Sequence, residues 1–152
     1  MIILGIRCST NDYTYAMLSG TVDSPNLSEV ATIPSPADYS QPEKLKWLLD
    51  ELQALNKKHS ITSWAIKGAE PMAAKGKPYA VRVEMEAMVS LSAAMTGSDI
   101  VVRKVKPTIA KDLGLKGRAK SLVEDLDYSK INGLKQKSEK EFEAIVVAWS
   151  SL

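Results

Sequence analysis

The N-terminal run of apolar residues is the feature that most restricts the fold. Ile2-Ile3-Leu4-Gly5-Ile6 is short and almost continuously apolar. A strand with one face in water alternates apolar and polar residues, whereas a short continuous run is typical of a strand buried on both faces. The segment therefore predicts an interior strand of a sheet.

Two more strands are predicted before the first helix. Residues 9–12 are polar and predict a turn, and residues 13–18 predict a strand that returns as a hairpin. Residues 20–26 predict a loop, and residues 29–33 predict a third, weaker strand before a group of prolines.

A long helix and a fourth strand are predicted next. The helix begins near Pro42, a residue that suits the first helical turn, and ends near Lys57 and Lys58. Residues 62–66 predict the fourth strand. The apolar stripe of the helix consists of Leu45, Leu48, Leu49, Leu52 and Leu55.

A loop over 68–78 leads to a second helix over 79–95, with Gly97 suited to the position after its end. Residues 99–103 predict a fifth strand. Residues 106–112 predict a helical turn, and residues 116–126 are consistent with another short helix.

The final helix is predicted to begin after Ser138, because Glu141 lies three residues on and completes a capping-box pattern. The main elements therefore run β-β-β-α-β-α-β-α-α. This order predicts an α/β fold with a five-stranded mixed sheet and helices packed on it. The side chains predicted to face the core from the final helix are Phe142, Ile145, Val146 and Trp149.

Length and composition predict one intracellular domain. The 152 residues match one ordinary domain, so 1–152 is expected to form a single unit. One cysteine, Cys8, excludes an internal disulfide and a multi-cysteine zinc site. No apolar run approaches the roughly 20 residues that cross a bilayer, and no signal-peptide pattern begins the chain. A cytoplasmic location without a membrane partner is expected.

Positive charge is concentrated in the middle of the chain. Residues 61–120 carry five acidic and eleven basic side chains, a net +6, whereas the segments before and after are each −2. This distribution suits a phosphate-bearing partner, and a solvated basic face without a partner is the alternative.

Four short segments, together with the order of elements, carry a resemblance to a known family. They are residues 3–6 before a polar turn, residues 64–67, residues 105–111 followed by 114–120, and residues 143–148. These features resemble the ribonuclease-H-like superfamily, and within it the RuvC-type Holliday-junction resolvases. The resemblance implies the fold of those nucleases.

A closer resemblance is to a small family of bacterial proteins of about this length. It covers most of the chain and implies the fold without implying an activity. The similar segments are Gly5-Ile6 with Thr10-Asn11-Asp12, Ala65-Ile66-Lys67, Lys75-Gly76-Lys77, Glu84-Met85-Glu86-Ala87 and Pro107-Thr108.

Nucleases with this fold use carboxylates to hold two divalent ions about 3.5–4 Å apart. The resemblance implies one acid on the first strand, one at the end of the fourth, and one or two on the last helix. Arg7, Lys67 and Glu143 occupy these positions, with Glu139 one turn before Glu143. A cation repels a metal ion, so the complete site is absent unless Glu70 or Glu84 approaches. No cofactor is expected apart from Mg²⁺ or Mn²⁺ at such a rebuilt site.

The candidate acids also have structural interpretations. Glu139 and Glu143 suit a solvated face near a helix N-terminus. Glu84 and Glu86 suit a solvated face as well, although Glu84 could form an ion-pair set with Arg82 and Lys67.

The charge beside Arg7 separates these interpretations. Contact between Arg7 and Glu143 would mean that an ion pair has replaced a metal site. Exposure of Arg7 beside Lys67 would instead add it to a phosphate-binding surface.

A basic rim is predicted to bind nucleic acid. Few aromatic residues are interleaved with its cations, so phosphate contacts with strong salt dependence are expected instead of base recognition. The predicted residues of the basic rim are Arg7, Lys67, Lys75, Lys77, Arg82, Arg103, Lys104, Lys106, Lys111, Lys116, Arg118 and Lys120.

Neither the single histidine nor the single cysteine indicates catalysis. His59 follows two lysines at a helix end, where its charge would complement the helix dipole. Cys8 is predicted to be a small buried strand residue, with a lowered pKa beside Arg7 as the alternative. The glycines form no nucleotide-binding loop pattern.

Three hypotheses for function remain open. The leading one is a catalytically degenerate ribonuclease-H-like domain that binds nucleic acid or another phosphate-bearing partner through the basic rim. The second is a metal-dependent nuclease that uses Glu143, Glu139 and either Glu70 or Glu84. The third is a protein-interaction module, a homodimer formed through an apolar helix face.

Overall fold

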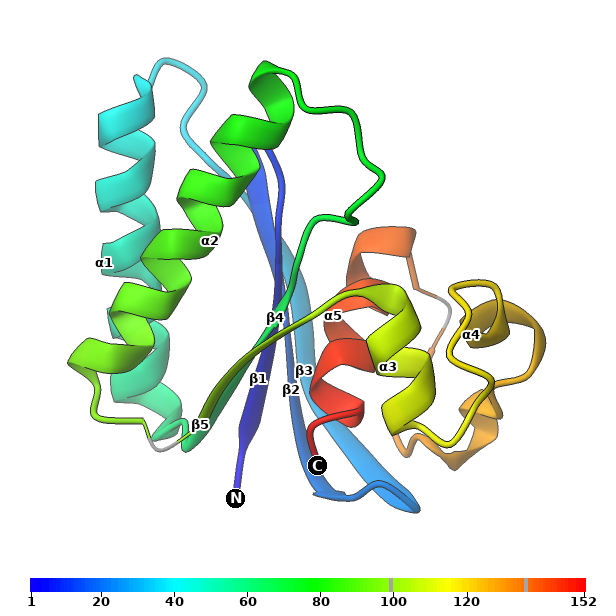
Figure 1. The fold of residues 1–152 in the computed structure, drawn as a ribbon. Helices are drawn as coiled ribbons and strands as arrows, with labels where there is room; N and C mark the ends of the chain where they lie inside the picture. Colours follow the sequence, from blue (N-terminus) through cyan, green and yellow to red (C-terminus); the bar gives the residue numbers. More distant parts are fainter. Residues whose placement is uncertain (99, 136) are drawn as a thin grey trace.

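One mixed sheet organises the chain, and its strands lie in the order β3-β2-β1-β4-β5. β1 (Ile3–Cys8), β2 (Asp12–Thr21) and β3 (Ser24–Pro34) are antiparallel neighbours. β4 (Ser63–Lys67) is parallel to β1, and β5 (Ile100–Lys104) is parallel to β4. The predicted α/β fold with a five-stranded mixed sheet is confirmed (Figure 1).

The computed structural model describes residues 1–98, 100–135 and 137–152. Within these ranges three α-helices and a 3-10 turn follow β5, where the predicted order has two helices. The helices are α1 (Gln41–His59), α2 (Lys77–Met95), α3 (Lys106–Asp112), α4 (Ser121–Glu124) and α5 (Glu139–Trp149), and the 3-10 turn η1 is Tyr128–Lys130.

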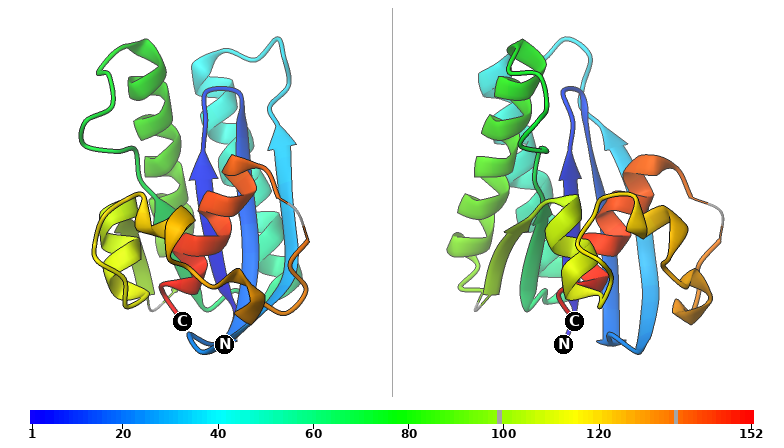
Figure 2. Two further views of the ribbon diagram at one scale, coloured as in Figure 1. Left: turned by 90° about the vertical axis from the view of Figure 1, so that its right-hand side faces the viewer. Right: turned by 45° about the vertical axis from the view of Figure 1, so that its right-hand side comes forward.

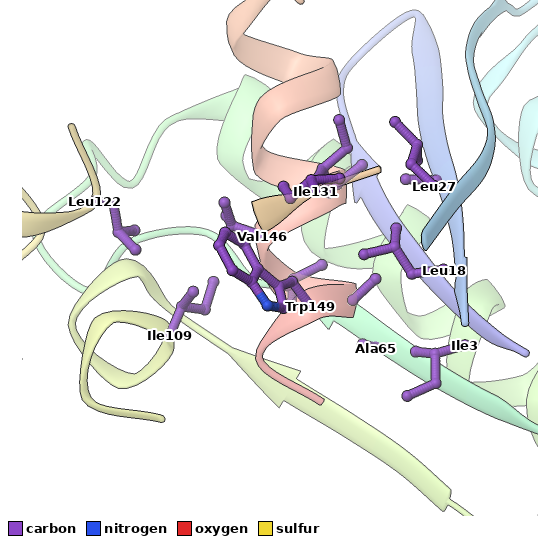
Figure 3. Close-up of a cluster of buried hydrophobic side chains, with 14 of the residues drawn as sticks. Ile3, Leu18, Leu27, Ala65, Ile109, Leu122, Ile131, Val146 and Trp149 are labelled. Carbon is purple, nitrogen blue, oxygen red and sulfur yellow. The ribbon is translucent and has the colours of Figure 1, made fainter. Parts of the chain in front are cut away.

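Helices cover both faces of the sheet. α1 and α2 lie on one face, and α5 lies on the other with α3 beside it (Figures 1 and 2). Two apolar cores result, one on each face. Figure 3 shows part of the core under α5, in which Val146 and Trp149 lie between Ile109 of α3 on one side and strand residues such as Leu18 on the other.

Alternation along β1 divides its side chains between these two cores. Leu4, Ile6 and Cys8 belong to the core under α1 and α2, whereas Ile3 belongs to the core under α5. Successive strand residues point to opposite faces, so Arg7 lies on the α5 side with Ile3. Burial on both faces is what the apolar N-terminal run predicts.

Gly5 allows α5 to lie directly on β1. A β-carbon at Gly5 would overlap the backbone oxygen of Ala144 and would lie 2.8 Å from Cβ of Ala148. Any larger residue would push α5 outward, so this glycine sets the depth at which α5 packs.

The second and third strands are longer than predicted. The predicted loop over 20–26 is wrong, because cross-strand pairing continues to Thr21 and Ser24 and leaves only residues 22–23 as the turn. Gly20 has a φ of +97°, which suits glycine at the end of such a hairpin. The turn-forming residues of this segment favour a loop, but β3 is an edge strand, and an edge strand tolerates proline and polar residues on its open side.

The helices differ from the prediction mainly at their ends. The predicted capping box at Ser138 forms at the start of α5, and the structure shows a second one at Ser40 before α1. The short helix predicted over 116–126 is confined to α4, because Gly117 has a φ of +71° and interrupts it. The predicted start of the fifth strand at residue 99 lies outside the described residues. In the part of the chain that the structure describes, each helix is too short or too polar to serve as a membrane span.

Candidate functional site

The carboxyl ends of β1, β4 and β5 meet at one edge of the sheet because these strands are parallel. Ligand sites in open α/β sheets lie at this edge. Arg7 lies one residue before the end of β1, while Lys67 and Lys104 end β4 and β5. α3 begins at Lys106, two residues after β5, and so brings a further cation to the same edge.

Arg7 and Glu143 form an ion pair across the β1–α5 contact. Nε of Arg7 donates a hydrogen bond to Oε2 of Glu143 at 3.0 Å, and Nη1 donates to Oγ of Ser9. The side chain of Glu143 is only 7% exposed. Of the two arrangements considered for Arg7, the structure shows the ion pair. The solvated helix face considered for Glu143 is wrong, because α5 lies flat on the sheet at this turn.

Lys106 holds the second oxygen of Glu143. Its Nζ lies 3.2 Å from Oε1 of Glu143 and 3.7 Å from Oε1 of Glu139. Burial raises the pKa of Glu143, but the charges of Lys67, Arg7 and Lys106 lower it, and the resulting pKa lies below the ordinary value of 4.5. Glu143 is therefore a carboxylate held by cations. Glu139, by contrast, is exposed as the solvated-face interpretation predicts.

Lys67 is buried instead of lining a surface. Its side chain is 1% exposed, and Nζ donates to Oε1 of Glu70 and to the backbone oxygen of Gly68, both at 2.7 Å. Burial lowers the pKa of Lys67, opposed by the hydrogen bond to Glu70 and the charge of Glu143. Strand alternation explains the correction, since it turns Lys67 toward α5 and away from solvent.

Glu70 joins the loop before α2 to the start of α3. Its Oε1 accepts hydrogen bonds from Nζ of Lys67 and, at 3.1 Å, from the backbone N–H of Lys106. We call these connected residues the inner ion cluster: Arg7, Lys67, Glu70, Lys106 and Glu143.

The inner ion cluster does not fit a pair of divalent metal ions. Cations already contact the carboxylate oxygens that a metal would require. Across residues 1–98, 100–135 and 137–152, no three histidine, cysteine, aspartate or glutamate side chains are placed to share a metal. Glu84 does not approach the cluster, because its Oε2 accepts from Nε2 of Gln41 on α1 at 2.9 Å.

A second buried carboxylate is that of Glu86, which belongs to α2 and faces the ends of β4 and β5. Its Oε1 accepts from Nε of Arg82 and from the backbone N–H of Ala69, both at 3.1 Å. Its Oε2 accepts from Nε and Nη2 of Arg103 at 3.0 and 2.8 Å. Arg82 also donates to the backbone oxygen of Lys67 at 3.1 Å. Glu86 thus ties α2 to the ends of β4 and β5.

The expected ion-pair set of Glu84, Arg82 and Lys67 is corrected by these contacts. Glu86 is the partner of Arg82, and it is buried, not on a solvated face. The i, i+4 spacing of Arg82 and Glu86 is a signal in the sequence that identifies this pair. No local signal identifies Arg103 as the third member, because it comes from another element.

Lys104 also has a structural partner. Its Nζ donates to the backbone oxygen of Ser150 at 2.7 Å and lies 2.9 Å from Oδ2 of Asp112. Lys104 therefore stabilises the C-terminal end of α5, where a cation complements the helix dipole.

The remaining residues of the basic rim are exposed, and we call them the outer basic group. In the described part of the chain only Lys120 among them forms a salt bridge, a loose one of 3.9 Å to Glu124. Both views of Figure 2 place the loop before α2 above α3 on the same side of the molecule. The outer basic group consists of Lys75, Lys77, Lys111, Lys116, Arg118 and Lys120.

The histidine and cysteine have structural surroundings. Cys8 is buried as predicted, and burial raises its pKa to about 12, more than Arg82 and Arg7 lower it. The alternative of a lowered pKa is wrong. His59 ends α1, and its Nε2 lies 3.6 Å from Oε2 of Glu29.

The whole arrangement is similar to solved Holliday-junction resolvases. RuvC from Thermus thermophilus in complex with a Holliday junction substrate matches with a TM-score of 0.76 and 11% identity over 99% of this chain and 91% of RuvC. The yeast mitochondrial resolvase Ydc2 matches with a TM-score of 0.66 and 11% identity over 97% of this chain and 76% of Ydc2. The fowlpox virus resolvase in complex with Holliday junction DNA matches with a TM-score of 0.56 and 8% identity over 98% and 97% of the two chains.

No protein-family model and no curated protein matches the sequence. At identities this low the structural similarity establishes the fold alone. That fold is ribonuclease-H-like, of the RuvC type, as the resemblance in the sequence implies.

Proposed function

We propose that this chain, which has the ribonuclease-H-like fold of RuvC-type resolvases, binds structured nucleic acid through its outer basic group and does not cleave it by two-metal catalysis. One observation carries the proposal. At the carboxyl edge of the sheet, cations occupy or neutralise the positions where the family resemblance implies metal ligands, whereas the cations of the outer basic group are exposed.

The binding part of the proposal rests on the availability of the outer basic group. Lys111, Lys116 and Arg118 have no carboxylate partner among the described residues, so their charge is free to meet phosphate. Lysine and arginine that contact phosphates release condensed counterions, and affinity then falls steeply with salt. Two of the similar structures, RuvC and the fowlpox virus resolvase, contain Holliday junction DNA. A branched DNA is therefore the first ligand to test.

The loss of cleavage rests on the inner ion cluster. Two-metal cleavage needs carboxylates that are free to bind both ions. Arg7 and Lys106 hold the two oxygens of Glu143, and Lys67 holds one oxygen of Glu70. The same contacts disfavour the alternative of a relocated carboxylate site. The alternative of a homodimeric interaction module is not favoured by any contact described above.

Binding is tested by fluorescence anisotropy with a labelled four-way DNA junction and a linear duplex of equal length. At about 50 mM salt both should bind, and affinity should fall steeply by about 200 mM. The plot of log affinity against log salt has a negative slope. The variant K116S/R118S should make this slope shallower by about 2, since each lost phosphate contact removes about 0.9.

The matched control is K57S/K58S, which removes the same charge from the exposed end of α1. Equal losses of DNA affinity in the two variants would show that net charge, not the outer basic group, drives binding. Absence of binding to both DNAs at about 50 mM salt would remove the binding proposal.

Cleavage is tested separately with the same two DNAs in millimolar Mg²⁺ or Mn²⁺. Both DNAs are expected to remain uncleaved over hours at micromolar protein. Metal-dependent cleavage that E143Q abolishes would contradict the proposed loss of catalysis and restore the nuclease hypothesis.

A further inference from the structure

A cavity of about 250 Å³ opens beside Arg7, between the end of β1, the loop before α2 and the first turn of α2. Its polar lining consists of two guanidinium groups and three hydroxyl groups. Alanines and a proline form the rest, and no carboxylate lines it among the described residues. The polar lining residues are Arg7, Arg82, Ser9, Thr10 and Tyr79.

Both arginines are held in place by hydrogen bonds within the protein, and each has N–H donors that these bonds do not use. Arg7 uses Nε and Nη1 toward Glu143 and Ser9, and Arg82 uses Nε and Nη2 toward Glu86 and the backbone of Lys67. A guanidinium has five N–H donors. Nη2 of Arg7 and Nη1 of Arg82 therefore remain without a partner in the described residues. Donors fixed in this way bind an anion without losing side-chain freedom.

The charge around the cavity is unbalanced. Five cations, two in the lining and three linked to it by ion pairs, share three buried or half-buried carboxylates. The cations are Arg7, Arg82, Lys67, Arg103 and Lys106, and the carboxylates are those of Glu70, Glu86 and Glu143. Exposed Glu139 contributes only a 3.7 Å contact with Lys106. A ligand with two negative charges would balance this excess better than a ligand with one. A phosphate monoester carries about −1.5 to −2 at pH 7, whereas an internal phosphodiester carries one charge.

The start of α2 favours the same ligand. The N-cap residue Gly76 supplies no side-chain cap, and the first turn contains no acid. Pro78 and Tyr79 of that turn line the cavity. The positive end of a 19-residue helix dipole therefore lies beside the guanidinium groups.

We propose that this cavity binds a phosphate monoester, the terminal phosphate of a nucleic-acid strand. Arg7 and Arg82 bind its oxygens, and the hydroxyls of Ser9, Thr10 and Tyr79 donate the remaining hydrogen bonds. The inference rests on the proposed function for the identity of the strand, while the chemistry of the cavity stands on its own lining. Such a site would add a preference for strand ends to the DNA binding of the outer basic group.

The test compares duplexes of one sequence with 5′-phosphate, 3′-phosphate or only hydroxyl ends, by anisotropy at about 100 mM salt. A phosphate end should bind about tenfold more tightly, as expected for charge-assisted contacts to two arginines. A73L fills the cavity without removing a charge and should abolish the preference. A54L on the exposed side of α1 is the matched control, and Y79F should weaken the preference partially with little risk to folding.

A further experiment adds a deoxynucleoside 5′-monophosphate to the protein and detects its binding by NMR. Chemical-shift changes confined to residues around the cavity, and lost in A73L with an unchanged melting temperature, support the site. Shift changes without a preference for phosphate ends would identify a free nucleotide as the ligand in place of a strand end. No shift changes at millimolar monophosphate and equal binding of all duplexes would overturn the inference while leaving the proposed function intact. Absence of binding to every duplex would instead remove the proposed function.

Discussion

The cations of the inner ion cluster and those of the outer basic group all belong to the predicted basic rim, yet they do different work. Arg7, Lys67 and Lys106 are largely buried and hold carboxylates. Lys111, Lys116 and Arg118 are exposed and hold none in the described residues. Cations that are close in the sequence can therefore serve different purposes, some stabilising the fold and others remaining available to bind phosphate. Substitutions that change stability without changing salt-dependent binding, and the reverse, separate the two.

The largest expected effect is that of E143A. It would leave Arg7 and Lys106 as uncompensated cations in a buried setting, and breaking a buried pair in this way costs about 3–5 kcal/mol. Urea denaturation should show this loss in the free energy of unfolding. E139A, one turn earlier and exposed, should stay within about 0.5 kcal/mol of the parent. Similar losses in both variants would mean that the inner ion cluster does not stabilise the fold.

G5A should have the next largest effect. The added methyl group would meet the backbone of α5, and overpacking of this kind costs about 1–3 kcal/mol. The same displacement should weaken the Arg7–Glu143 contact. G76A is the control, because a β-carbon there meets only Cδ of Pro78 at 3.7 Å. Denaturation midpoints close to the parent for both variants would contradict the tight α5 packing.

Acid should weaken the inner ion cluster before it affects the outer basic group. The pKa of Glu143 in the folded state lies below 4.5, its ordinary value, so between the two the unfolded chain binds more protons than the folded chain. The stabilisation from Glu143 is fully present above pH 4.5 and is lost as the pH falls through the folded-state pKa. Unfolding free energies between pH 3 and 5 should therefore rise with pH, and this slope should be reduced in E143Q. An unchanged slope in E143Q would argue that other carboxyl groups account for it.

The smallest effect on stability is expected from K116S/R118S, the variant designed to weaken DNA binding. Both side chains are exposed, and substitutions at such positions usually change stability by less than about 0.5 kcal/mol. Thermal and urea unfolding should match those of the parent. A loss comparable to that of E143A would show that these residues stabilise the fold, and the contrast between the two regions would fail.

Much of the fold can be predicted from local patterns. Helical leucine spacing locates α1, and the Ser138–Glu141 capping box locates the start of α5. The pairing of β2 with β3 across residues 20–26 cannot be predicted locally, because this segment has the composition of the loop predicted there and its pairing depends on cross-strand hydrogen bonds.

The candidate site could be predicted only in part. Arg7 and Glu143 were linked through the family resemblance, and their contact is present. The burial of Lys67 and the role of Glu86 were missed. A lysine and a glutamate are mostly exposed in proteins, and no local pattern overrides that expectation unless the packing of distant elements is known.

Periodicity, capping and charge are local properties of the chain, so they predict the order of the strands, the long helices and the accumulation of positive charge in residues 61–120. Which of these charges remain unpaired depends on contacts between elements that the fold brings together. Arg103 reaches Glu86 from β5, and Arg7 reaches Glu143 on α5 from β1. Such pairs form between elements distant in the chain, and burial makes them selective because an unpaired charge in the interior is costly.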